Sequence, residues 1–282
     1  MKRIVYVSLG LLLFLSCQQR TAVEIEVGVM RVHFIHPDAK TKVTNTEFES
    51  GDEIGLFVVE APAPLQVSGN YINNLQATFN GTNWTGSSSL RWPSNTSTCD
   101  LYGYYPHMDV TSIVANPFCV SKDQSAGIGA SDFIWGKVFA QDYTTDPIPL
   151  EFQHKLSKIT LNLVKGSTYE GDYPTDAVFY IHGTVPDATI DFTTGSVTKD
   201  LYGSAQTITC HKVSDSQYEA IIIPQRIATR TPLFEMVSHG VSYLVEGTFN
   251  FKPGINYAFD VTLNASTESI RIEIGGEIED WQ

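Results

Sequence analysis

Apolar and polar residues alternate along several short segments of the chain, a period of two that is typical of half-buried β-strands. In the clearest cases, residues 159–163 and 257–263, an apolar side chain occupies every second position. Similar segments recur at about ten-residue intervals, at 178–182, 189–192, 207–211, 218–223 and 241–251. No convincing amphipathic helix and no internal repeat interrupts them. The pattern therefore predicts an all-β chain built as a sandwich or a barrel.

Glycine and proline mark the turns between these segments. Gly51 precedes a mostly apolar run at residues 54–59, which predicts a turn that leads into a buried strand. Residues 220–223 are apolar on both faces, so we expect a central strand there that ends at Pro224. The Pro-Gly pair at residues 253–254 predicts a tight hairpin turn.

Two prolines at residues 147–149 suggest where the chain divides. They stand directly before a new, strongly alternating segment. Domain boundaries fall in proline-rich connections of this kind. We therefore expect one β-sandwich domain at residues 18–147 and a second at residues 148–282.

The first seventeen residues have the pattern of an export signal. Two basic residues are followed by a twelve-residue apolar run at 4–15, which is too short to span a bilayer but fits a secretory signal. Ser16 and Cys17 come next, and a small residue before a cysteine indicates a lipoprotein signal peptide. Cleavage would leave Cys17 as the first residue, carrying acyl chains such as palmitate that anchor the protein to a membrane. The alternative is an ordinary signal peptide with a chance cysteine.

Both ends of the mature chain carry alternating apolar residues. The N-terminal set consists of Val23, Ile25, Val27 and Val29. The C-terminal set consists of Ile270, Ile272, Ile274, Ile278 and Trp281. Each set predicts a strand. The C-terminal strand has two interpretations, an ordinary sheet strand or a donor strand that completes the sheet of the next molecule.

Charge and motif content narrow the function classes. The formal net charge of −13 and the pI of about 4.9 argue against a nucleic-acid partner, which demands basic patches. The seven histidines lack metal-ligand spacing, and no zinc-protease, P-loop or nucleophile-elbow motif is present. We therefore predict no enzyme, no metal and no cofactor, with two carboxylates meeting in a glycosidase-like cleft as the alternative. His154 is expected to be a core or hydrogen-bonded histidine.

Cysteine and aromatic residues leave further alternatives open. Cys99 and Cys119 form a disulfide or remain free thiols, and the second is favoured. Cys210 lies in an alternating segment and is expected to be a buried small hydrophobic residue. The aromatic side chains of Trp84, Trp92 and residues 102–105 belong to the sandwich core or line a ligand patch, and the core is favoured.

Six short motifs carry a family resemblance. They follow the signal peptide and are residues 46–57 (TEFESGDEIGLF), 102–106 (YGYYP), 152–159 (FQHKLSKI), 220–225 (AIIIPQ), 251–257 (FKPGINY) and the terminal Trp281. In this order, over nearly the whole chain, they resemble the fimbrillin-like family of the Bacteroidales, which comprises major and minor fimbrial subunits. The resemblance implies two tandem β-sandwich domains of the transthyretin-like, Greek-key type and a role in cell adhesion.

The family's assembly mechanism is a further implication of the resemblance. A trypsin-like protease removes an N-terminal segment with its first strand, and the C-terminal strand of another subunit fills the groove that opens. Arg31, Lys40 and Lys42 are the candidate cleavage sites. Residues 23–30 would be the removable strand and residues 270–281 the donor strand.

The resemblance also indicates partners and location. We expect other fimbrial subunits in a homo- or hetero-polymer, the outer membrane through the lipid on Cys17, and a host protein or glycan as an adhesion target. The expected location is the cell surface, in a fimbrium, with the stalk, tip or anchor position left open. The alternative is a lipid-anchored, non-polymerising surface module that binds a glycan or a host protein.

Overall fold

The structure, a computed structural model, describes residues 28–37, 48–86, 90–227, 232–264 and 278–280 of the 282-residue chain. In these ranges the chain is all-β and contains no α-helix, as the alternating pattern predicts. Short 3-10 turns such as η2 (Gly129–Ser131) are the nearest approach to helix. None of the described segments forms a helix with the length and apolarity needed to cross a membrane.

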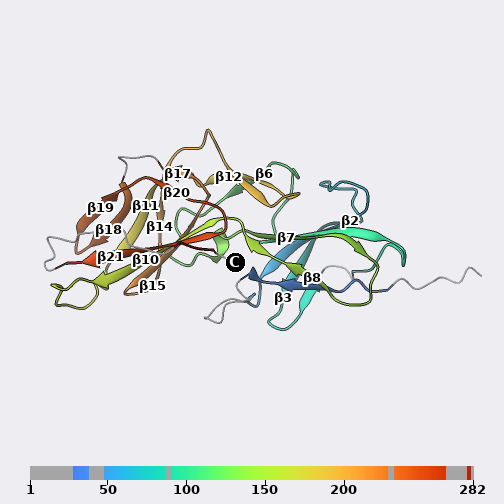
Figure 1. Cartoon of the computed structure of the whole chain (residues 1–282), viewed down its shortest axis with the longest axis horizontal. Coiled ribbons are helices and arrows are strands. Elements are labelled where there is room, and N and C mark those ends of the chain that lie inside the picture. The colour runs from blue at the N-terminus through green and yellow to red at the C-terminus, as the bar shows by residue number, and fades with distance from the viewer. Residues whose placement is uncertain (1–27, 38–47, 87–89, 228–231, 265–277, 281–282) are drawn as a thin grey trace, which may run out of the picture.

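A six-stranded sheet organises one half of the molecule, at the right of Figure 1. Its strands, in spatial order, are β4 (Trp84–Gly86), β3 (Ile72–Phe79), β2 (Glu53–Glu60), β5 (Thr98–Tyr105), β7 (Ile134–Asp142) and β9 (Gln153–His154). The central strand β2 is buried on both faces along residues 54–59, which confirms the buried strand predicted there. This double burial requires a covering layer on each side of the sheet.

The two faces are covered by different layers. On one face, Leu56 and Leu101 pack in a cluster with β1 (Val32–Ile35) and β8 (Ile148–Glu151). On the other face, aromatic side chains meet Phe192, directly after β12 (Asp187–Asp191). Strand β12 is the middle of a small sheet with β13 (Ser196–Lys199) and β6 (Asn116–Cys119).

The other half of the molecule is a sandwich of two larger sheets, at the left of Figure 1. The first sheet has the order β15 (His211–Ser214), β16 (Gln217–Ile222), β10 (Ser157–Lys165), β21 (Ile255–Leu263) and β22 (Ile278–Asp280). The second has the order β14 (Gln206–Thr209), β11 (Val178–Thr184), β18 (Pro232–Ser238) and β19 (Val241–Glu246). The rings of Phe234 in β18 and Phe259 in β21 lie 4.9 Å apart between the two sheets.

Some local predictions are confirmed and one is wrong. Strand β16 lies between β15 and β10, so the strand before Pro224 is an inner strand as expected. The turn at residues 252–254 exists, but it is not a hairpin. The preceding strand β20 (Phe249–Asn250) pairs with β17 (Arg226–Ile227), whereas β21 pairs in parallel with β10. The chain therefore passes from one sheet to another at this turn.

Strand pairing crosses the expected division at residue 147/148. Strand β8 pairs with β1, β9 pairs with β7, and β12 pairs with β6. The two halves are therefore joined by shared sheets as well as by the chain connection. The division into domains at 18–147 and 148–282 stays a prediction.

Candidate assembly site

The N-terminal strand β1 is a structural part of the core of the first half. It pairs in parallel with β8, with Val32 opposite Ile148 and Phe34 opposite Leu150. Phe34 is 8% exposed and Met30, just before the strand, is 2% exposed. Burial of an apolar side chain of this size contributes about 1.5–3 kcal/mol. These two side chains therefore hold the segment firmly against the six-stranded sheet.

Backbone hydrogen bonds fix this segment in two places along its length. The amides of Ile148 and Phe152 donate to the carbonyls of Arg31 and Ile35, at 2.8 and 3.0 Å. Before the strand, the amide of Met30 donates to the carbonyl of Leu90 at 3.1 Å. Pairing of an extended segment with the edge of another strand is the geometry of β-augmentation.

Aromatic rings line this groove. The ring of Phe34 lies 5.2 Å from Trp84, edge-on, and 6.2 Å from Phe152. The ring of Phe48 lies 4.8 Å from that of Trp84 and 5.8 Å from that of Phe152. A hollow of about 620 Å³ runs alongside the segment, between Phe34 and Leu90. Removal of β1 would enlarge this hollow into an open apolar groove.

Of the predicted N-terminal site residues, the structure describes Val29 and Arg31. Val29 forms a single bridge with Arg91 and is 48% exposed, while Val23, Ile25 and Val27 lie outside the described residues. Arg31 is exposed and stands directly before β1. Lys40, Lys42 and Cys17 also lie outside the described residues.

Strand β1 itself was not predicted. Its signal is the alternation of Met30, Val32 and Phe34 with exposed Arg31 and His33, which is shifted by one residue from the apolar positions 23, 25, 27 and 29. The predicted strand ends at residue 30, whereas the regular pairing begins at residue 32.

The C-terminal strand pairs within the chain. Strand β22 runs antiparallel to the start of β21, with Ile278 opposite Tyr257 and Asp280 opposite Ile255. It lies at the edge of its sheet. The other predicted donor-strand residues, Ile270, Ile272, Ile274 and Trp281, lie outside the described residues.

The aromatic residues that could have formed a ligand patch belong mainly to the core, as favoured. Trp92 is 1% exposed and Tyr104 is fully buried. The Tyr104 hydroxyl donates to the carbonyl of Met108 at 3.0 Å, and burial raises the pKa of Tyr104 far above its ordinary value. Trp84 and Tyr105 are half-buried. These rings therefore stabilise the fold and offer no exposed aromatic platform.

Two further predictions concern His154 and the cysteines. His154 is 4% exposed with its Nδ1 atom 3.0 Å from Oδ2 of Asp132, so it is a buried histidine beside a carboxylate, as expected. The described part of the chain holds no group of three metal-ligating side chains. Cys99 and Cys119 are both free thiols, and Cys210 is buried as predicted.

Comparison with known proteins agrees with this geometry. The model of the fimbrillin-like family matches residues 41–281. One curated relative, "Putative fimbrium tip subunit Fim1C" of Bacteroides ovatus, is 38% identical over 73 residues, which is 25% of this chain. The aligned stretch spans only 13% of that relative's length.

Solved structures show the same fold over most of the chain. A "putative cell adhesion protein" from Bacteroides uniformis superimposes with a TM-score of 0.72 and 19% identity, covering 90% of this chain and all of that one. A second protein of that description, from Bacteroides ovatus, gives a TM-score of 0.69 and 17% identity, covering 91% of this chain and 98% of that one. At these identities the likeness concerns the fold alone.

Proposed function

The chain belongs to the fimbrillin-like family, and we propose that this fimbrial subunit is exported as a lipoprotein and joins its neighbours by β-strand exchange. The family consists of structural and adhesion subunits, not of enzymes. The relative named as a fimbrium tip subunit supports a place in a fimbrium at the cell surface. Acylation of Cys17 and transit through the outer membrane are part of the proposal.

The observation that carries the proposal is that β1 is the sole pairing partner of β8 among the described strands. Strand β8 pairs with β1 alone in this two-stranded sheet. Release of β1 would free the pairing edge of β8 and uncover the apolar side chains that contact Met30 and Phe34. A strand from another subunit could restore both the hydrogen bonds and the burial.

The position of β1 decides which cleavage site would work. A cut after Arg31 would leave β1 attached to the body of the protein, because β1 begins at Val32. A cut after Lys40 or Lys42 would place all of β1 on the released fragment. We therefore propose Lys40 or Lys42 as the productive site, with residues 28–35 as the essential part of the removed segment.

The proposed donor is the C-terminal stretch at residues 270–281. Its alternating isoleucines match the apolar-in pattern that a groove next to β8 requires. Its last part forms the short edge strand β22, which makes only three pairings with β21. An edge strand of this length is held weakly and is suited to exchange between subunits.

Limited trypsin digestion tests the proposal. The chain starting at Gln18 is digested, and fragment masses and oligomer size are followed together. We expect a cut within residues 38–47 followed by a ladder of oligomers. The variant Arg31→Gln should behave like the wild type, while Lys40→Gln/Lys42→Gln should stay monomeric.

A chain ending at residue 269 is the second control. It should be cut normally but form no ladder, because it lacks the donor. Ladders formed by this shortened chain would overturn strand exchange through the C-terminus. Quantitative loss of residues 18–42 with a monomeric product would overturn the proposal as a whole.

A further inference from the structure

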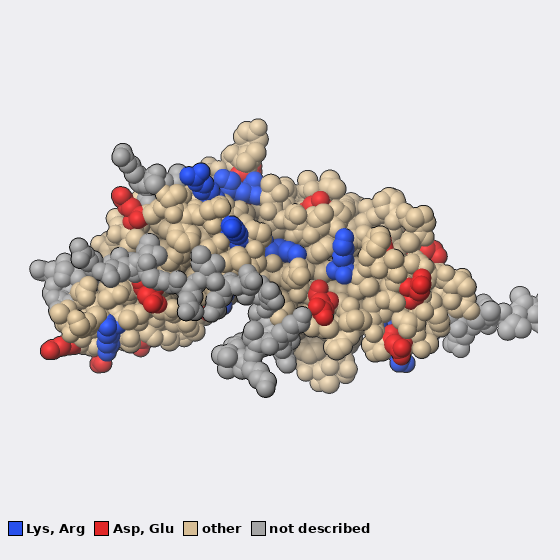
Figure 2. All heavy atoms as spheres, in the orientation of Figure 1, with Lys and Arg blue, Asp and Glu red and all other residues tan. Residues whose placement is uncertain are grey.

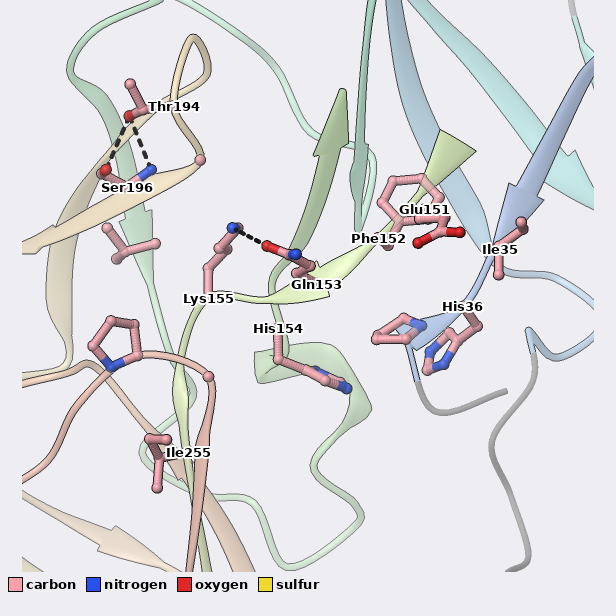
Figure 3. Close-up of a pocket in the computed structure, with 15 residues that line it drawn as sticks. Ile35, His36, Glu151, Phe152, Gln153, His154, Lys155, Thr194, Ser196 and Ile255 are labelled. Carbon is pink, nitrogen blue, oxygen red and sulfur yellow. Dashed lines mark hydrogen bonds between the residues drawn. The ribbon is translucent and has the colours of Figure 1, made fainter. Parts of the chain in front are cut away.

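A polar cleft of about 640 Å³ lies beside the end of β1, where the two halves of the molecule meet (Figure 3). One wall is the strand segment 151–155. The opposite walls are the β12–β13 turn at residues 194–197 and the turn before β21 at residues 253–255. Lys155 and Gln153 project from one side of their strand, and His154 projects from the other.

The Trp135 ring anchors this cleft. Trp135 is 7% exposed and its indole Nε1 donates to the carbonyl of Phe192 at 2.9 Å. Gly195 has a φ of +71° and packs on the ring so closely that a Cβ atom there would lie 2.5 Å from it. Only glycine fits this position. The ring therefore fixes the β12–β13 turn in place beside Lys155.

Lys155 brings a positive charge without a described counter-ion. Its Nζ lies 5.1 Å from the centroid of the Trp135 ring and donates to Oε1 of Gln153 at 3.1 Å. No described carboxylate forms an ion pair with it, and partial burial lowers the pKa of Lys155. A second ammonium, that of Lys137, lies 5.9 Å from the same ring. An anion entering the cleft would therefore meet the ammonium of Lys155 at the edge of a partly dry site.

Positive charge at this place is unusual for this protein. The chain carries 31 acidic and 18 basic residues, yet two lysines converge on one ring. Figure 2 shows several basic side chains along the middle of one face, with acidic ones among them and toward both ends. Local potential of this kind attracts an anionic ligand.

The other polar groups of the cleft are suited to hydroxyl groups of a ligand. Thr194 and Ser196 expose hydroxyls that bond to one another at 2.9 Å, and Gln153 exposes an amide. Hydroxyls and amides both donate and accept, as sugar hydroxyls do.

We propose that this cleft binds an acidic saccharide, with its carboxylate on Lys155 and its hydroxyls on Thr194, Ser196 and Gln153. The ligand class follows from the combination of one unpaired ammonium with several mixed donor–acceptor groups. Ile35, His36 and Pro37 complete the wall beside Glu151, so this site belongs to the uncleaved chain and would lose that wall on release of β1.

The test uses the full mature chain with Cys17→Ser and three probes, glucuronic acid, N-acetylneuraminic acid and neutral glucose. Binding is measured by calorimetry and by the NMR shift of the Trp135 indole N–H. We expect at least one acid to bind and to shift this signal, and glucose to bind about tenfold more weakly. Lys155→Met should weaken the acid about tenfold or more.

Lys165→Met is the matched control, because Lys165 also lies on an aromatic ring, 4.7 Å from the centroid of Tyr173. It should leave binding unchanged, and thermal unfolding of both variants shows that they are folded. The double variant Thr194→Ala/Ser196→Ala should weaken binding of the acid and should not strengthen binding of glucose. The proposal is overturned if neither acid shifts the Trp135 signal, if glucose binds equally well, or if polyglutamate binds in place of the acids.

Discussion

The ring of Phe34 in β1 lies edge-on to the ring of Trp84 in β4, with 5.2 Å between their centroids. This contact ties the N-terminal segment to the outer strand of the six-stranded sheet. We therefore expect Phe34→Ala to lower the free energy of unfolding by about 3–5 kcal/mol. Chemical denaturation measures this effect, with His33→Ala, its exposed neighbour, as a nearly neutral control. A loss as small as that of the control would mean that β1 contributes little to the fold.

A second prediction concerns Gly55 in the centre of β2. A Cβ atom at this position would lie 2.2 Å from ring carbons of Tyr104, which is held by its hydrogen bond to Met108. We expect Gly55→Ala to destabilise the protein by about 1–3 kcal/mol or more, because neither the ring nor the strand can move freely. Gly129→Ala is the control, since no atom lies within 4 Å of its Cβ position. Equal melting temperatures for the two variants would contradict this account.

The three described cysteines should differ in reactivity. Cys99 and Cys210 are buried, and burial raises the pKa of Cys99 to about 11 and that of Cys210 further still. Cys119 is exposed, although partial burial of its thiol and nearby Asp187 also raise its pKa. Because the thiolate is the reactive form, we expect one slow modification in the chain starting at Gln18. Mass spectrometry should locate it at Cys119, Cys119→Ser should abolish it, and unfolding should release all three thiols.

A fourth prediction follows from the polar cluster on the outer face of β18. Ser242 donates a hydrogen bond to Glu235, and His182 lies 2.8 Å away, so the pKa of Glu235 is below its ordinary value. A depressed carboxyl pKa contributes stability above the ordinary value of 4.5, and that contribution is lost as the pH falls through the depressed value.

Ser242→Ala should therefore raise the Glu235 pKa toward its ordinary value, as measured by NMR titration of the carboxyl carbon. The stability difference from the wild type should be present above about pH 4.5 and vanish in more acidic solution. Ser214→Ala, whose hydroxyl pairs with Ser216, should leave the Glu235 titration unchanged. An unshifted pKa in Ser242→Ala would show that the hydroxyl is not the main cause.

Much of the fold could be predicted from local pattern. The alternation at residues 159–163 and 257–263 predicted β10 and β21, and the apolar run at 54–59 predicted the doubly buried β2. In these segments, the local pattern of apolar residues indicates which side chains are buried. The family resemblance rested on these same strands and turns, and the match of the family model over residues 41–281 bears it out.

The features that the sequence did not predict depend mostly on pairings between residues that are far apart in the chain. Strand β1 pairs in parallel with β8 across more than a hundred residues, and no local pattern specifies such a partner. Strand β18 was not predicted because its apolar residues, at 233, 234, 236 and 237, do not alternate strictly with polar ones. The proposed saccharide cleft could not be predicted from the sequence for a similar reason. Lys155 and Ser196 converge only because both segments pack on Trp135.

The most direct test of the central claim measures whether β1 and the C-terminal strand compete for one groove. A subunit ending at residue 269 is prepared intact and after trypsin removal of β1, and each form is titrated with a fluorescent peptide of residues 268–282. We predict that cleavage adds a binding site for the label, and that an unlabelled peptide of residues 28–37 displaces the label from that site. Equal binding to both forms, or binding that residues 28–37 cannot displace, would contradict the shared groove.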